Sequence, residues 1–326
     1  MEILAPDFNL AMTLDSGQVF HWEKAGVGFV GTAGDVAVYV EEENDVLKVR
    51  FGGTPKPARS PRRIRPVADE THALPKRIAH YFALDHPLPE IRESFPNDPV
   101  MNAARDFCRG LRIIRQPKWE CLATFICSST KQVAHIRQIS LALRNRFGDQ
   151  RKIGSRAVHT FPSPQRIARA SESQLRGCKL GYRAKNLRAT AQLVSSGECD
   201  LESWSTLPDS DLRKNLCELP GVGVKIANCV MLFAYERLRA FPIDVWIERV
   251  LRRHYFPRRK KMTAQQLREF SETYFGEHGG YAQQYLFHHA RITSRKTEVS
   301  RDSSTPKAFG VRNDRLAQVV SPAGLR

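Results

Sequence analysis

The spacing of apolar residues changes near residue 74 from a strand-like to a helical period, and this change constrains the fold more than any other feature. Between residues 14 and 51, β-branched and aromatic residues form short runs such as 36–40 and 46–51, separated by glycines and an Asn-Asp pair. This pattern is typical of antiparallel strands. From about 74 to 292 the apolar residues follow the helical period instead. We therefore predict an α+β protein, in which a small N-terminal antiparallel β domain is followed by an all-α domain.

The β domain, with one helix after its strands, is predicted to cover residues 1–98, and the helical domain residues 99–292. Residues 52–70 are basic and rich in proline without any period, so we expect a mobile insertion there. Residues 293–326 are rich in Ser, Thr, Arg and Pro, and we expect a disordered basic tail. The helices of the second domain are predicted near residues 99–114, 117–127, 130–147, 163–170, 172–177, 183–195, 209–218, 223–237, 244–254, 263–275 and 279–292.

The net charge indicates the class of binding partner, and the cysteine pattern indicates the redox environment. The formal net charge is +17 at pH 7, which favours a polyanion, above all a nucleic acid, over an unspecialised basic surface. No run of 18 apolar residues occurs, so we expect neither a membrane span nor a membrane partner, and the N-terminus lacks the basic region of a signal peptide. The seven cysteines are scattered without a C-x-x-C pair, which favours a reduced intracellular setting over disulfide frameworks and zinc ribbons.

The most informative motif is Leu-Pro-Gly-Val-Gly at residues 219–223. A helix from Asp209 would end there, and a second helix would run from Val224. Gly221 and Gly223 permit unusual backbone angles and leave amide groups unshielded at a helix N-terminus, where the helix dipole favours anions. The motif predicts a helix-hairpin-helix that binds a DNA phosphate, and an ordinary turn between packed helices is the alternative.

Lys225 falls in the first turn of this second helix. The positive end of a helix disfavours an ammonium and so favours the neutral amine, the form that nucleophilic attack on a sugar carbon requires. A phosphate-binding or solvated lysine is the commoner alternative. Nineteen residues later, Asp244 stands where an apolar segment meets a helix. It is predicted to be an N-cap, a carboxylate that stabilises positive charge on a sugar, or both.

The region 219–250, which contains the hairpin and the aspartate, resembles the HhH-GPD signature of base-excision DNA glycosylases and is similar to 8-oxoguanine DNA glycosylases in particular. Further segments resemble this family in the family's order; they are residues 16–22, 125–129, 180–184 and 281–287. Together the resembling segments extend over about residues 8 to 292.

The resemblance implies a bifunctional enzyme that excises 8-oxoguanine from double-stranded DNA after flipping the base out of the helix. Lys225 would attack C1′, displace the base and form a Schiff base, through which the strand is cleaved by β-elimination. Asp244 would assist cleavage of the sugar bond. No metal or organic cofactor is implied. We expect a monomer that acts in the cytoplasm or nucleoid of a bacterium, or in the nucleus of a eukaryote.

The resemblance also implies a base pocket. The backbone carbonyl of Gly17 would accept the N7–H of oxidised guanine, where normal guanine has an acceptor. Gln283 would read the Watson–Crick edge, and Phe287, four residues on and so on the same helix face, would stack on the base. Cys229, four residues after Lys225, would lie on the opposite face of the base. Without the resemblance, Phe287 and Cys229 would be predicted as core residues.

Tyr182 and Arg183 resemble residues that fill the vacated stack and contact the orphaned cytosine. The chain departs from the family pattern at positions that would contact the cytosine, a phosphate and the base pocket; these are Thr130 with His135, Trp246, and Ala290, respectively. The sequence therefore specifies the lesion better than the base opposite it.

Two other functions explain part of the sequence. One is an HhH glycosylase of different lesion specificity. The iron–sulfur loop of endonuclease III-like and adenine-mismatch enzymes has no counterpart, because the last cysteine is Cys229, and alkylation-repair relatives usually lack the lysine. The other is a non-catalytic HhH DNA-binding protein, which would explain the glycines of the hairpin and the net charge. It leaves the pairing of Lys225 with Asp244 unexplained.

Overall fold

The protein was analysed as a computed structural model that describes residues 1–52, 67–129, 132–258 and 262–303. Residues Met1–Ala290 form one compact unit, and the second unit, Arg291–Arg326, is described as far as Ser303. Among the described helices, none combines the length and the apolar character needed to cross a bilayer. Within the same ranges, no three His, Cys, Asp or Glu side chains are grouped so that they could hold a metal ion.

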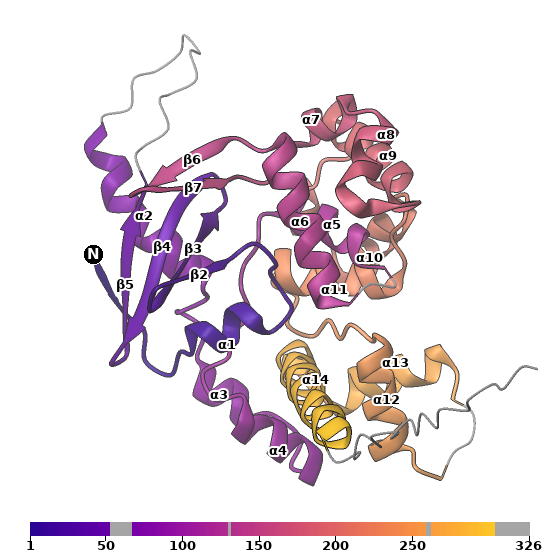
Figure 1. Cartoon of the computed structure of the whole chain (residues 1–326). Helices are drawn as coiled ribbons and strands as arrows, with labels where there is room; N and C mark the ends of the chain where they lie inside the picture. The colour runs from indigo at the N-terminus through magenta and orange to yellow at the C-terminus, as the bar shows by residue number, and fades with distance from the viewer. Residues whose placement is uncertain (53–66, 130–131, 259–261, 304–326) are drawn as a thin grey trace, which may run out of the picture. The chain divides into compact units, whose positions relative to one another are not determined.

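The N-terminal part is an antiparallel sheet with its own apolar core, as predicted. Its five strands have the order β1-β5-β4-β3-β2 (Figure 1). Alternate residues of the central strands, such as Val38 and Val40, are buried with Leu47, Trp22 and Phe82. The elements of this part are β1 (Glu2–Leu4), α1 (Leu10–Asp15), β2 (Glu23–Ala25), β3 (Gly28–Ala33), β4 (Val36–Glu43), β5 (Val46–Phe51), α2 (Val67–Tyr81) and α3 (Leu88–Glu93).

The rest of the first unit is mainly helical, and a second, larger apolar core lies among its helices. The α-helices are α4 (Pro99–Phe107), α5 (Lys118–Ser128), α6 (Val133–Phe147), α7 (Pro164–Arg169), α8 (Glu172–Leu175), α9 (Arg183–Ser196), α10 (Asp209–Glu218), α11 (Val224–Ala234), α12 (Val245–Val250), α13 (Ala264–Tyr274) and α14 (Gly279–Ser303). Short π or 3-10 segments are η1 (Arg176–Leu180), η2 (Ser203–Thr206), η3 (Leu251–Tyr255) and η4 (Gly276–His278). Most helices begin and end close to their predicted positions.

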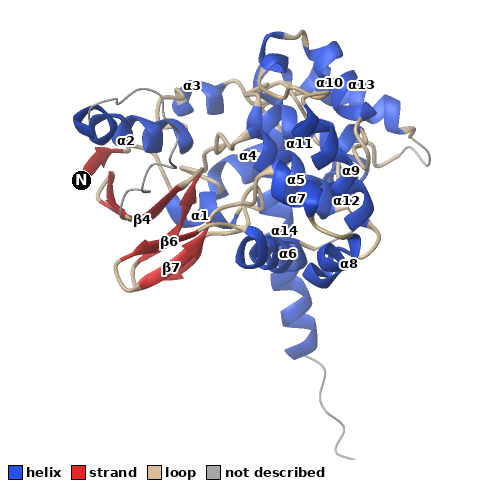
Figure 2. Ribbon diagram, turned by 90° about the horizontal axis from the view of Figure 1, so that it is seen from above, coloured by secondary structure: helices blue, strands red, loops and turns tan. Residues whose placement is uncertain are grey.

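The prediction of an all-α domain over 99–292 is wrong at one place, because β6 (Gln150–Ile153) and β7 (Arg156–His159) form an antiparallel hairpin. These strands are short and mostly polar, so their sequence alternation is weak. They lie beside the N-terminal sheet, with β6 next to β4 (Figure 2). Strand β7 lies next to β3. The hairpin is therefore stabilised by partners more than 100 residues away, which local pattern does not reveal.

Other elements also differ from the prediction: helix α4 ends at Phe107 instead of near residue 114, and helix α3 was not predicted. Helix α2 begins at Val67, so residues 67–70 of the expected 52–70 loop are helical; they contain neither proline nor glycine. Helix α14 continues to Ser303, so the expected disordered tail is wrong for residues 293–303. Once a helix is nucleated, each added residue contributes a hydrogen bond without a new nucleation cost, which explains a helix that outlasts its apolar period. Residues 53–66 and 304–326 lie outside the described residues.

A buried polar cluster joins the sheet to helices α5 and α6. The guanidinium of Arg144 binds the carboxylate of Glu120 and donates to Thr32 Oγ1 at 2.9 Å, while His21 Nδ1 lies 3.5 Å from Glu120 Oε1. Burial is the main cause that lowers the pKa of His21 well below its ordinary value, so its imidazole is neutral near pH 7. Buried ion pairs contribute little net stability, but Arg144 links Thr32 of the sheet to Glu120 of α5, whose last residue is Ser128.

Candidate active site

The two helices predicted on either side of the turn 219–223 of the helix-hairpin-helix are confirmed (Figure 1). The turn is closed by a hydrogen bond from the Val222 amide to the Leu219 carbonyl at 3.1 Å. Gly221 has φ +81°, and a Cβ there would lie 2.8 Å from Asn186. Both the backbone angle and the close contact therefore favour glycine at this position. Gly223 is the exposed N-cap of α11, and a Cβ there would meet no described atom within 4 Å. The backbone at this helix N-terminus is therefore accessible to an anion.

Lys225 is the second residue of α11, and its side chain is directed against α5. Its Nζ lies 3.4 Å from Ser128 Oγ and 5.5 Å from the centroid of the Phe125 ring. The residue is half-buried. The amine is thus held beside the C-terminal end of α5.

Asp244 is the N-cap of α12, which confirms the capping prediction: its Oδ1 accepts a hydrogen bond from the Ile247 amide at 2.8 Å. Burial is the largest cause that raises the pKa of Asp244, while the Ile247 amide and the charge of Lys225 lower it. The pKa of Cys229 is raised to about 11, because the effect of burial exceeds the opposing effect of the Lys225 charge. Helices α11 and α12 therefore bring the predicted nucleophile, carboxylate and pocket cysteine into one electrostatically coupled group.

Gly17 and Phe287, 270 positions apart in the sequence, are brought together. A Cβ at Gly17 would lie 3.0 Å from Phe287 Cε1, and the glycine has φ +87°, in the region that favours glycine. The structure thus places the backbone of residue 17 directly against the aromatic ring that is predicted to stack on the base.

Gln18 fixes this glycine, and the sequence analysis assigned it no role. Its side chain is fully buried. Its Nε2 donates to the Arg112 carbonyl at 2.8 Å and its Oε1 accepts from the Ile114 amide at 2.7 Å. On the other side, Gln284 of α14 donates to the Ser16 carbonyl at 2.9 Å. A glutamine at the start of the mostly apolar segment 18–22 was the available sign of this role.

Gln283 lies in α14 one turn before Phe287, as the shared-face prediction requires. Only 4% of the residue is exposed, and its Oε1 has no hydrogen-bond partner among the described residues. A buried amide oxygen without a donor costs free energy. This oxygen therefore retains an unused capacity to accept a hydrogen bond.

We predict that Gly17→Ala destabilises the protein and slows base excision. Alanine would have to adopt the strained positive φ, which costs roughly 1–3 kcal/mol, and its Cβ would press on Phe287. Thermal unfolding measures the first effect and single-turnover excision the second. Gly197→Ala is a suitable control, because Gly197 also has positive φ but its Cβ would meet nothing described within 4 Å. Equal excision rates for both variants would contradict a pocket role for Gly17.

Tyr182 and Arg183 are oriented differently. Tyr182 is 60% exposed, whereas Arg183 is only 4% exposed. The Arg183 Nε donates to the Ser129 carbonyl at 2.9 Å, and its Cζ lies 4.3 Å from the centroid of the Tyr182 ring. Tyr182 is open to solvent, and the predicted DNA contacts of both residues stay predictions. The C-terminal end of α5 thus contacts both Arg183, through Ser129, and Lys225, through Ser128.

The structure describes three of the four positions that depart from the family pattern. Thr130 lies outside the described residues, and His135 is exposed in the first turn of α6. Trp246 is half-buried beside Asp244, with the Cζ of Arg249 5.6 Å from its ring centroid. Ala290 is half-buried in α14.

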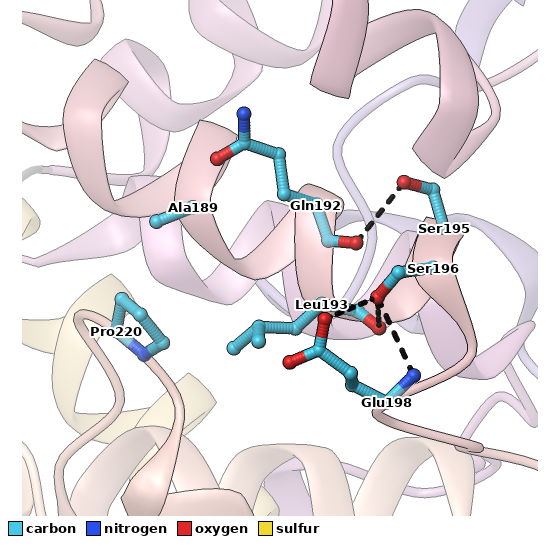
Figure 3. Close-up of a pocket in the computed structure, with 7 residues that line it drawn as sticks. All are labelled: Ala189, Gln192, Leu193, Ser195, Ser196, Glu198 and Pro220. Atoms are coloured by element: carbon cyan, nitrogen blue, oxygen red, sulfur yellow. Dashed lines mark hydrogen bonds between the residues drawn. The ribbon is translucent and has the colours of Figure 1, made fainter.

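A hollow near the hairpin is not the candidate active site. It is lined by residues of α9 and the segment after it, together with Pro220 (Figure 3). Ser196 Oγ lies within hydrogen-bond distance of the Leu193 carbonyl and of the Glu198 carboxylate. Neither Lys225 nor Asp244 belongs to its lining.

Known families match the chain over most of its length. Residues 2–122 match the family described as the N-terminal domain of 8-oxoguanine DNA glycosylase, and residues 123–273 match the HhH-GPD superfamily base excision DNA repair protein. A probable N-glycosylase/DNA lyase of Methanothermobacter thermautotrophicus is 29% identical over 318 residues, which cover 89% of this chain and 96% of that protein.

Two further relatives agree with these matches. An N-glycosylase/DNA lyase of Saccharomyces cerevisiae is 30% identical over 270 residues, which cover 76% of this chain and 68% of that protein. The structure of Clostridium acetobutylicum 8-oxoguanine glycosylase/lyase, in complex with double-stranded DNA containing cytosine opposite 8-oxoguanine, has a TM-score of 0.78 and 26% identity, with 90% of this chain and 98% of that chain covered. The chain therefore belongs to the 8-oxoguanine DNA glycosylase/lyase family of the HhH-GPD superfamily of base excision DNA repair enzymes.

Proposed function

We propose that this protein excises 8-oxoguanine from double-stranded DNA, with Lys225 as the nucleophile, and then cleaves the strand at the abasic site. The observation that carries the proposal is the placement of the Lys225 amine beside Ser128 while it is coupled electrostatically to Asp244. The adjoining hairpin is accessible to a phosphate. Relatives named N-glycosylase/DNA lyase support both activities.

The proposed chemistry uses groups that this site contains. Lys225 Nζ forms a bond to C1′ as the C1′–N9 bond breaks, and the departing base keeps the electron pair and takes up a proton. The Asp244 carboxylate stabilises the positive charge that develops on the sugar. After ring opening, the lysine–C1′ imine acidifies C2′; loss of a proton there expels the 3′ phosphate and cleaves the strand.

The flipped base is proposed to bind between residues of α14 and the segments that face this helix. The Gly17 carbonyl accepts the N7–H of 8-oxoguanine, whereas the N7 lone pair of normal guanine would meet another acceptor. Phe287 stacks on the flipped base, with Cys229 on its other face. The unpartnered Oε1 of Gln283 accepts from the Watson–Crick edge. Each contact needs an extrahelical base, and one protein molecule supplies all of them, so we propose that it acts as a monomer.

The proposal is tested by borohydride trapping of the wild-type protein on three duplexes, which contain 8-oxoguanine, undamaged guanine or a preformed abasic site. We expect a covalent adduct with the first and third duplexes. An adduct with the abasic duplex alone would indicate a glycosylase of different lesion specificity. Folded protein that binds all three duplexes without any adduct would indicate a non-catalytic DNA-binding protein.

We predict that the excision rate falls on the acid side at a higher pH than an ordinary aspartate would give. Burial raises the pKa of Asp244, and excision requires the carboxylate, so activity is lost as the pH falls through this raised value. Single-turnover rates from about pH 4 to about pH 8, around the reference aspartate value, measure the effect. An acid limb at or below the ordinary aspartate value would contradict the assignment, and so would an identical limb in Asp244→Asn.

A further inference from the structure

We infer that Ser128 is a positioning residue, which orients the amine of Lys225 for attack on the sugar. The inference rests on the proposed role of Lys225 as nucleophile. Ser128 is the last residue of α5 and is only 5% exposed. Its Oγ lies 3.4 Å from Lys225 Nζ, a long hydrogen bond of the kind that catalytic groups show before substrate binds.

The direction of this hydrogen bond is fixed by a second one. Ser128 Oγ donates its single hydrogen to the Phe125 carbonyl, 2.7 Å away in the same helix. A hydroxyl has one donor and two acceptor lone pairs, so only the lone pairs of Ser128 face Lys225. The amine must therefore donate an N–H to Ser128. When the amine is neutral, one N–H is then directed at Ser128 and its lone pair points away from α5.

Asp244 acts on the amine through its charge, but within the described residues no hydrogen bond or ion pair joins the two side chains, and the other contacts of the amine offer no equivalent oxygen. The Phe125 ring, 5.5 Å from Nζ, is stacked on Phe233 with the two ring planes 10° apart, so it forms an apolar wall. Cys229 lies one turn along α11, and its thiol is only a weak acceptor. Within these surroundings, Ser128 provides the oxygen acceptor that selects a rotamer of the long lysine side chain.

The acceptor itself is rigidly held. Every residue of α5 from Glu120 to Ser128 is buried, and Glu120 is bound to Arg144 in the polar cluster described above. A fixed acceptor on a packed helix reduces the conformational freedom that Lys225 would otherwise lose on attack, and such pre-orientation raises the rate of a reaction between bound groups.

The test is Ser128→Ala, assayed with a duplex that carries a preformed abasic site at saturating protein. In this reaction Nζ attacks the C1′ aldehyde, the carbonyl oxygen leaves as water, and borohydride delivers hydride to the C=N bond. We expect about a tenfold slower adduct formation, the size of one lost hydrogen bond, with the Kd for DNA unchanged. Ser128→Thr keeps the hydroxyl, which can still bond the carbonyl three residues back, and should restore most of the rate.

Ser271→Ala is a matched control. Ser271 is a buried serine in α13, and its Oγ donates to the Leu267 carbonyl at 2.8 Å, so the substitution removes the same atoms and the same kind of backbone bond. Its adduct rate should equal that of the wild type. If Ser128→Thr does not fold, Ser128→Cys, with its weak acceptor, should give an intermediate rate.

Equal rates for the wild type and Ser128→Ala would overturn the inference, and so would equal losses in Ser128→Ala and Ser271→Ala. These outcomes differ from failure of the proposed function itself, in which the wild-type protein would give no adduct at all.

Discussion

Lys225→Gln is expected to abolish the covalent protein–DNA adduct and strand cleavage. Glutamine has no nucleophilic nitrogen, so no bond to C1′ can form, and loss of such a group lowers catalysis by roughly 10³-fold or more. DNA binding should stay close to that of the wild type, because the hairpin backbone at Gly221 and Gly223 is unchanged. Trapping on the 8-oxoguanine duplex and a separate binding titration measure the two effects.

Lys24→Gln is the control for this prediction, because Lys24 is exposed in β2 of the N-terminal sheet. The control should form the adduct at the wild-type rate. A persistent adduct in folded Lys225→Gln would assign the nucleophile to another amine and remove the basis for the role of Ser128. Loss of both DNA binding and adduct would instead indicate that Lys225 serves mainly to hold a phosphate.

The features that could be predicted from the sequence are those with local causes. The end of α10 and the start of α11 follow from the turn residues 219–223, whose backbone preferences act over a few positions. The N-cap at Asp244 is equally local. The hairpin β6–β7 was missed because its stability comes from the distant sheet, and the extension of α14 to Ser303 because helix propagation needs no apolar period.

The candidate site shows the same division. Lys225 and Asp244 could be identified from the residue types and their spacing, and Gly17 and Phe287 from a family resemblance that spans the chain. The inward orientation of Arg183, the anchoring of Gly17 by Gln18 and the contact of Ser128 with Lys225 depend on which helices and loops pack together. No spacing rule contains that information, since the residues in contact are up to about a hundred positions apart.

Asp244→Asn is expected to slow base release by roughly 10²-fold or more, the effect of removing one group that stabilises transition-state charge. DNA binding and the thermal midpoint should be retained. Asparagine is as good an N-cap as aspartate. In the wild type the Ile247 amide donates to Asp244 Oδ1 at 2.8 Å, and the side-chain amide oxygen of asparagine can accept the same hydrogen bond. What the variant loses is the negative charge near the sugar.

The raised pKa of Asp244 also predicts whether Asp244→Asn stabilises or destabilises the protein. Because burial raises the folded-state pKa of Asp244, this group contributes stability that is full below its unfolded pKa and is lost as the pH rises through the folded value. At neutral pH the ionised carboxylate therefore costs stability, which a neutral asparagine does not. The midpoint of Asp244→Asn should equal or exceed that of the wild type near pH 7, with a smaller difference in acid.

Asp98→Asn separates the catalytic role of Asp244 from its capping role. Asp98 is the N-cap of α4 and accepts from the Val100 and Met101 amides at 2.9 Å, so the same substitution is made at a second cap. Base release by this control should match the wild type. If Asp244→Asn instead lowered the thermal midpoint, and lost DNA binding and base release equally, the aspartate would be mainly structural. A selective loss of base release in a protein as stable as the wild type would support a catalytic role for the charge of Asp244.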